Sequence, residues 1–176
     1  MENKKTFWLI FATVLIFLVL LLIARPKVDP DILTVEEQGG DHIEIPIKEL
    51  QTLKGIDFQN LTPDTDDAEI IHTVELLERF YEKYSEEKGK TLIKIFYLDQ
   101  ILRYSRLGLL DYWRLTFHST DGASVMIAPQ EFKDNIILIS LEKQKGELTL
   151  RLIMPEDPFS QRWLKNVARI VVETNN

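Results

Sequence analysis

A run of 19 residues without a charged side chain stands near the start of the chain, from Thr6 to Ala24 (TFWLIFATVLIFLVLLLIA). As an α-helix this run would extend about 28 Å, close to the thickness of the hydrocarbon core of a bilayer. Its residues are apolar on every face, whereas a helix packed on a protein core usually shows one apolar stripe. We therefore expect a transmembrane anchor over residues 6–24, with the lipid bilayer as its partner.

A cleaved signal peptide is the main alternative to this anchor. Such a peptide has a shorter apolar core and small residues at its cleavage site, and Leu22 and Ala24 supply only half of that site. Basic residues flank the run equally on both sides, but the short head also carries the α-amino group. We expect a single-pass cell-membrane protein with a cytoplasmic head (residues 1–5) and an extracytoplasmic remainder.

The composition excludes several classes of function. The chain has no cysteine among its 176 residues, so it can form no disulfide framework, thiolate zinc site or iron-sulfur cluster. Its net charge of −7 argues against sequence-independent nucleic-acid binding, which depends on clustered Lys and Arg. We therefore expect no nucleic-acid partner.

The chain after the apolar run divides into a linker and one domain. Residues 25–40 (RPKVDPDILTVEEQGG) contain two prolines, several acids and a glycine pair, without a sustained hydrophobic period. We read this segment as a linker. Residues 41–176 are long enough to bury a single core, and they form the expected extracytoplasmic domain.

Hydrophobic periodicity predicts the elements of this domain. Pro46 lacks an N–H for a ladder hydrogen bond, so the first predicted strand should lie at a sheet edge. Strands and helices follow one another without regular alternation, which predicts an α+β fold with a mixed β-sheet. The expected strands are 42–47, 56–61, 91–96, 112–118, 124–128, 136–141, 148–154 and 167–173, and the expected helices are 66–88, 97–108 and a short turn over 129–132.

Six short motifs follow one another in a fixed order from Thr91 onward. They are Leu98-Asp99-Gln100-Ile101-Leu102 to Gly108, Phe117 to Asp121-Gly122, Pro129-Gln130-Glu131-Phe132, Ile136 to Leu141, Gly146 to Leu150-Arg151-Leu152 and Pro155, and Trp163-Leu164-Lys165-Asn166-Val167 to Ile170. This order resembles the carboxy-terminal two thirds of the sulfite-oxidase-like molybdopterin-binding domain, and Ile43–Leu53 fits the opening strand of that family. The resemblance implies a mixed-sheet oxidoreductase fold that holds a molybdopterin cofactor.

The chain departs from that family where the metal would be held. Active members resembling sulfite oxidase bind molybdenum through a cysteine thiolate soon after the opening strand, and the corresponding region here, Ile56 to Asn60, has none. Carboxylate or amide oxygens do not replace a soft thiolate ligand. The resemblance therefore implies a fold more than a reaction.

Four residues are candidate cofactor contacts by this resemblance. Arg151 and Lys165 match positions in a family whose basic residues can contact the pterin phosphate, and the alternative for both is a strand-surface ion pair with neighbouring acids. Asp121 and Gly122 match the Asp-Gly step of the family, and the alternative for them is a simple turn. We identify no metal ligands and no catalytic constellation.

The sequence leaves three functions open. The first is a membrane-anchored, extracytoplasmic, non-catalytic binding or interaction module with a molybdopterin-oxidoreductase-like fold, which needs no cofactor and has an envelope protein as partner. The second is a molybdopterin-dependent redox enzyme or subunit with unusual metal ligation. The third is a structural envelope assembly factor. The missing cysteine makes enzymatic activity uncertain and favours the first reading.

Overall fold

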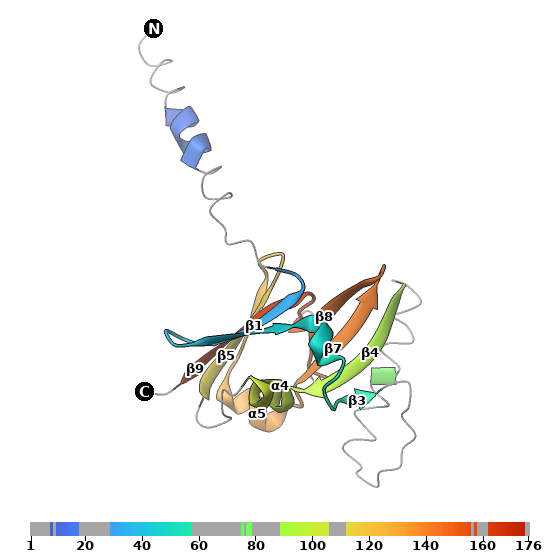
Figure 1. Ribbon diagram of the computed structural model, residues 1–176. Helices are drawn as coiled ribbons and strands as arrows, with labels where there is room; N and C mark the ends of the chain where they lie inside the picture. Colours follow the sequence, from blue (N-terminus) through green and yellow to red (C-terminus); the bar gives the residue numbers. More distant parts are fainter. Residues whose placement is uncertain are drawn as a thin grey trace.

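A computed structural model describes residues 8, 10–17, 29–57, 75, 77–78, 89–105, 112–155, 157 and 162–174. The described strands form two sheets that pack around one core (Figure 1). The helices between them are short, and each covers an end of the core rather than a whole face. These are α2 (Ile47–Leu50), α4 (Leu98–Tyr104) and α5 (Pro129–Asp134).

The first sheet has five strands. Strand β9 lies at its centre, parallel to β1 and antiparallel to β5, and the other pairs are antiparallel. In spatial order the strands are β2 (His42–Pro46), β1 (Ile32–Glu37), β9 (Val167–Thr174), β5 (Tyr112–Ser119) and β6 (Ser124–Ile127). The prediction that Pro46 would belong to an edge strand is confirmed, because β2 forms one edge of this sheet.

The second sheet has four antiparallel strands. In spatial order these are β3 (Ile56–Asp57), β4 (Lys90–Tyr97), β7 (Leu138–Gln144) and β8 (Glu147–Ile153). Strands β7 and β8 form a hairpin whose two turn residues, Lys145 and Gly146, have φ of 52° and 93°. Positive φ at both positions is the geometry of the tight turns that join twisted antiparallel strands.

The main core lies between the two sheets. Leu33 and Val35 of β1 and Leu115 and Phe117 of β5 are fully buried there, because the inner face of each strand carries every second residue. The remaining members include Ile45, Ile170, Val172, Phe96, Ile139, Leu141, Leu150 and Leu152, with Ile47, Leu50, Ile101 and Leu102 from α2 and α4.

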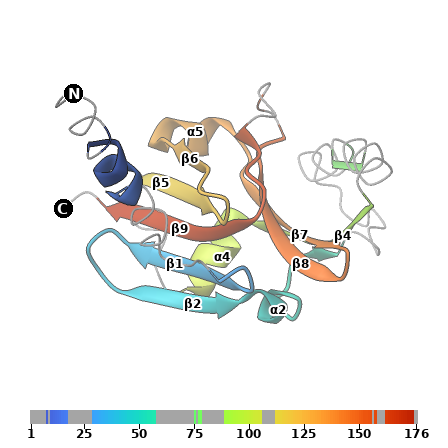
Figure 2. The same ribbon diagram turned by 90° about the horizontal axis from the view of Figure 1, so that it is seen from above.

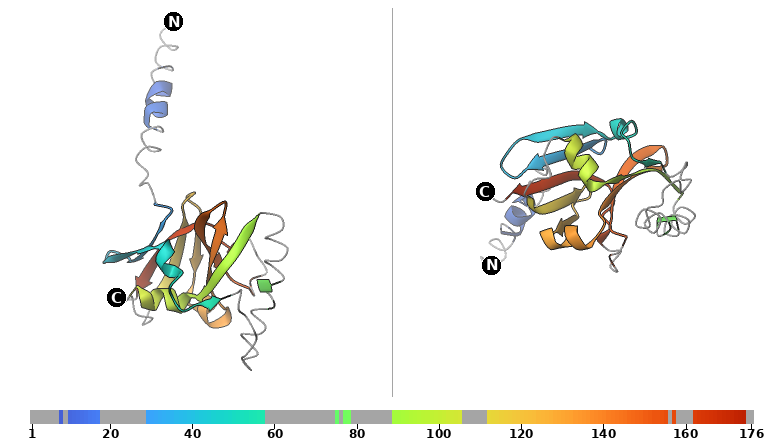
Figure 3. Two further views of the ribbon diagram at one scale, coloured as in Figure 1. Left: turned by 45° about the vertical axis from the view of Figure 1, so that its right-hand side comes forward. Right: turned by 90° about the horizontal axis from the view of Figure 1, so that it is seen from below.

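A smaller cluster covers the outer face of the second sheet. Leu77, which is helical and 1% exposed, packs there with Ile95, Leu138 and Ile153. Figure 3 shows the described fragment around Leu77 beyond β4, on the side away from the five-stranded sheet. Strand β7 is therefore buried on both faces, as its run of five buried residues shows.

The predicted α+β class is wrong. The fold is mostly β, with two sheets in place of one mixed sheet and its helices. The prediction underestimated the strand content in part because it read residues 25–40 as a linker, whereas Ile32–Glu37 forms strand β1 beside β9. The predicted helix over 66–88 lies outside the described residues, except for the helical positions 75, 77 and 78.

The predicted membrane location is also contradicted. Within the expected anchor, residue 8 and residues 10–17 are helical, and the other positions of 6–24 lie outside the described residues. In the part of the chain that the structure describes, no helix is both long and apolar enough to cross a bilayer. The predicted single-pass transmembrane location, and the orientation inferred from it, are therefore wrong.

Candidate functional site

A groove of about 560 Å³ lies where the start of β1, the end of β2 and the β7–β8 turn meet. Figure 2 shows α2, which follows β2 directly, beside the β7–β8 hairpin. A smaller cavity of about 160 Å³ shares Ile47 and Glu147 with the groove and extends it towards Thr120 and Asn166. The groove is lined by Asp29, Asp31, Ile32, Pro46, Ile47, Lys48, Gly146, Glu147 and Leu148.

Backbone hydrogen bonds hold the β1 side of the groove. The carboxylate Oδ1 of Asp29 accepts a hydrogen bond from the N–H of Asp31 at 2.9 Å. This is an Asx turn, in which an Asp side chain bonds to the backbone two residues later. The carbonyl of Asp31 in turn accepts the N–H of Ile47 at 2.8 Å. These bonds fix the start of β1 against α2, so the groove wall does not depend on side-chain packing alone.

The charge of the lining is predominantly negative. Asp29, Asp31 and Glu147 carry carboxylates and are exposed, and Lys48 is the single basic residue of the lining. Ile32, Ile47 and Leu148 are half-buried or buried and supply apolar surface between these charges. The groove thus combines an apolar floor with an acidic rim.

The structure brings Lys165 and the Asp121-Gly122 turn close to the smaller cavity. The N–H of Thr120, next to Asp121, donates to the carbonyl of Asn166 at 3.0 Å. Gly122 has a φ of 89°, and Asp121 Oδ1 accepts the N–H of Ala123 at 3.0 Å. This bond lowers the pKa of the Asp121 carboxyl. The Asp-Gly pair therefore has the geometry of a turn.

The side chain of Arg151 does not line the groove or the smaller cavity. Its side chain is 3% exposed, and its Nε donates to Oε1 of Glu142 at 2.6 Å. Lys90 Nζ lies 3.3 Å from the other oxygen of the same carboxylate, and Ser140 Oγ donates to Oε1 at 3.2 Å. The guanidinium is thus held in a buried ionic cluster on the outer face of the second sheet.

These positions do not fit a pterin phosphate. Arg151 and Lys165 are cross-strand neighbours, but the Arg151 guanidinium is buried against Glu142. The carboxylate of Glu147 lines the smaller cavity beside Lys165 as well as the groove that adjoins it. The groove adds two further carboxylates, and these negative charges repel a phosphate. Among the described residues, no group of three His, Asp or Glu side chains is placed to hold a metal ion.

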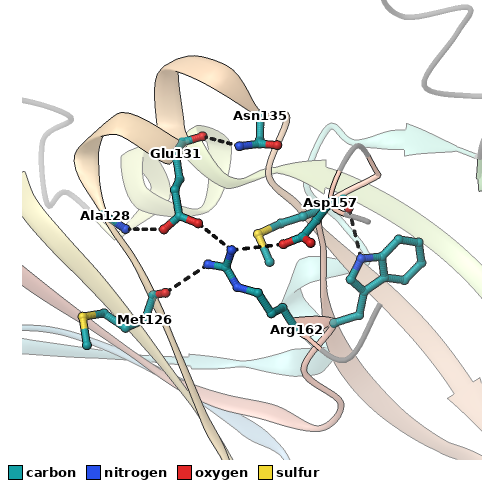
Figure 4. A network of polar contacts seen from close by, with 8 residues as sticks. Met126, Ala128, Glu131, Asn135, Asp157 and Arg162 are labelled. Atoms are coloured by element: carbon teal, nitrogen blue, oxygen red, sulfur yellow. Dashed lines mark hydrogen bonds and ion pairs between the residues drawn. The ribbon is translucent and has the colours of Figure 1, made fainter. Parts of the chain in front are cut away.

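A second polar network joins α5 to the chain before β9 (Figure 4). Arg162 donates to Glu131 and to Asp157, and also to the carbonyl of Met126 at 3.2 Å. Glu131 accepts the N–H of Ala128 at 2.8 Å and so caps α5. Every charge in this network has a partner, and we assign it a structural role.

Sequence reasoning missed the groove residues. Asp29 and Asp31 lie in the predicted linker, and Glu147 is the first residue of β8, directly after the hairpin turn. One local signal was present, because Asp-Pro-Asp before the alternating Ile32–Glu37 is typical of a turn that starts a strand. No local pattern indicates that this turn meets the β7–β8 hairpin more than 110 residues later.

Comparison with known proteins places the chain in no family. No protein-family model matches it, and no curated protein matches it significantly.

Proposed function

We propose that this chain is a non-catalytic binding module that holds a basic polypeptide segment in the groove between β1, α2 and the β7–β8 hairpin. The observation that carries the proposal is the acidic rim around an apolar floor in a groove of about 560 Å³. A groove of this size falls within the usual range of ligand-binding pockets, about 300–1,000 Å³.

The negative charge of the groove favours a positively charged ligand. Three carboxylates against one ammonium group create a negative potential, and the whole chain carries a net charge of −7. Such a field attracts cationic partners and raises their rate of association. Lys or Arg side chains fit best because their long apolar stems can lie on Ile32, Ile47 and Leu148 while their charged ends reach the rim.

The chemistry of the lining supports binding rather than catalysis. The groove carries carboxylates and one amine, but its lining includes no histidine, hydroxyl or thiol that could act as a nucleophile beside a base. Its polar groups are exposed. Exposed groups lack the desolvation that commonly tunes catalytic acids and bases.

A labelled peptide tests the proposal directly. The probe is an end-blocked hexapeptide of alternating lysine and valine, and the measurement is its fluorescence anisotropy with the full chain at low and high salt. We expect binding that weakens with salt, because the contacts of the rim are ionic. An end-blocked hexapeptide of alternating glutamate and valine is the matched probe and should not bind.

Variants of the rim locate the binding. The double variant Asp31→Asn, Glu147→Gln removes two lining charges, each worth about 0.5–1 kcal/mol at a surface, so the Kd should rise about 5- to 30-fold. Glu44→Gln is the control, because Glu44 is exposed on β2 and does not line the groove. Equal affinity of both variants for the probe would exclude the groove as the binding site.

A further inference from the structure

Strand β8 is the edge of the second sheet that faces the groove. In an edge strand, the N–H and C=O of every second residue bond to the neighbouring strand. The N–H and C=O of the residues in between point outward, away from the sheet. The N–H of Leu152 points outward, because it donates to the carbonyl of Leu164 at 2.9 Å and not to β7. By alternation, the backbone groups of Leu150 and Leu148 point outward as well.

The chain covers only the second half of this edge. Leu164 and Lys165 run along β8, and Lys165 is the cross-strand partner of Arg151. At Asn166 the backbone takes a φ of 52°, and from Val167 it continues as β9 in the other sheet. The short stretch that precedes β9 therefore leaves β8 just before it would reach Leu148.

The edge at Leu148 is left open to the groove. In the described part of the chain, Leu148 takes part in no backbone hydrogen bond outside the β7–β8 ladder, and it lines the groove. The other strand edge at the groove is different, because β2 ends there on Pro46, which has no N–H. Proline and charged residues commonly protect edge strands from pairing. Strand β8 carries no proline, and of its two charged residues Arg151 is buried and Glu147 stands at the end of the strand.

We propose that the basic segment binds as an added strand on the edge of β8, antiparallel to it and in line with Leu164 and Lys165. This inference rests on the proposed function and adds the mode of binding. Strand addition pairs the backbone of the ligand with the sheet, while side-chain pockets select its sequence. Because side chains alternate along a strand, one set would face the apolar floor and the other the carboxylates of the rim.

N-methylation of the probe tests this mode without altering the protein. The alternating lysine–valine hexapeptide is made in two further forms. One is methylated on the backbone nitrogens of its valines and the other on the backbone nitrogens of its lysines. An added strand uses the N–H groups of every second residue, so one form should lose about tenfold or more in affinity and the other about twofold at most. Similar losses for both forms would overturn strand addition.

Amide hydrogen exchange gives a second readout within the protein. A saturating amount of the unmethylated probe should slow exchange of the Leu148 amide at least tenfold. The Thr149 amide is the internal control, because alternation turns it towards β7 with or without the peptide. A probe that binds without protecting Leu148 would refute strand addition and leave the groove as a basic-peptide site. Absence of any binding would instead refute the proposed function itself.

Discussion

The Nε of Arg151 lies 2.6 Å from Oε1 of Glu142, and the two side chains are 3% and 1% exposed. This pair bridges β8 and β7 on the face of the sheet that also carries the cluster containing Leu77. An ion pair so far from water is costly to break, because the remaining charge keeps its desolvation penalty without its partner. Arg151 therefore acts as a structural residue.

Arg151→Ala should reduce the free energy of unfolding by about 3 kcal/mol or more, because it leaves the Glu142 carboxylate buried with fewer partners. Urea denaturation of the full chain measures this loss. Arg103→Ala is the matched control, since Arg103 forms an exposed i, i+4 pair with Asp99 and should lose less than about 1 kcal/mol. Equal losses in the two variants would show that the Arg151 pair is not stabilising.

The position of Arg151 shows what sequence patterns resolve and what they leave out. Leu148, Leu150 and Leu152 alternate with Thr149 and Arg151, which predicts strand β8 and the face that meets the main core. The same alternation suggests that Arg151 faces solvent. It is instead 3% exposed, on the face where Leu77 packs against Ile153, and a two-residue period carries no information about such tertiary contacts.

The first sheet shows a similar division. Alternation over Trp113–Phe117 and over Ile43–Ile47 was sufficient to predict β5 and β2. The Asp-Gly pair was sufficient to predict a turn between β5 and β6. Strand β1 was missed because its Leu33 and Val35 stand between prolines, acids and glycines that favour a linker. Its partner β9 is more than 130 residues away, so only tertiary pairing completes it.

Stability should also depend on Glu131 at low pH. A hydrogen bond from Arg162 lowers the pKa of the Glu131 carboxyl below its ordinary 4.5, against a smaller opposing effect of burial. A carboxyl with a depressed pKa in the folded state contributes stability above its unfolded pKa, and that contribution is lost as the pH falls through the folded pKa. The affected window therefore lies below about pH 5.

Glu131→Gln isolates this charge, because a glutamine oxygen can still accept the Ala128 N–H. Urea unfolding should show the variant about 0.5–1.5 kcal/mol less stable than the parent at pH 7, with the difference shrinking towards pH 3. In an Arg162→Gln background the same substitution should have a smaller effect at pH 7, since the partner of the carboxylate is absent. A difference that did not change with pH would contradict the ionic role.

His118 should titrate below its ordinary pKa of 6.5. Burial lowers the pKa of its ring most, the charge of Arg169 lowers it further, and Glu36 acts in the opposite direction. Arg169 is the cross-strand partner of His118 and is paired with Glu36. Because the unfolded state takes up the proton first, stability should fall as the pH drops from about 6.5 through the folded pKa.

Arg169→Gln should raise the pKa of His118, because it removes a positive neighbour and leaves the attraction of Glu36. An NMR titration of the imidazole signals in the parent and the variant measures the change. Arg103→Gln, which removes the exposed charge that pairs with Asp99, should leave the His118 titration unchanged, because Arg103 is not among the groups that shift its pKa. A pKa that stayed constant in Arg169→Gln would show that the charge of Arg169 does not lower it, and a fall would contradict the expected repulsion.

Asn166 should tolerate glycine and reject a β-branched residue. Its φ of 52° lies in the left-handed region, which Asn and Gly adopt readily and Val does not. Asn166→Val should lose about 1–3 kcal/mol of unfolding free energy, and Asn166→Gly less than about 1 kcal/mol. Urea denaturation distinguishes the two. Equal stability of the two variants would mean that this backbone geometry imposes no strain.

Lys145→Asn should stabilise the hairpin that borders the groove. Lys145 and Gly146 both have positive φ, and Asn-Gly is the pair that such two-residue turns prefer. We expect a gain of about 0.5 kcal/mol, seen as a rise in Tm, because asparagine adopts the left-handed region at lower cost than lysine. Lys143→Asn makes the same change of charge within strand β7, where asparagine is disfavoured, and should lower the Tm slightly. If both variants shifted the Tm alike, the lost charge rather than the turn geometry would account for the effect.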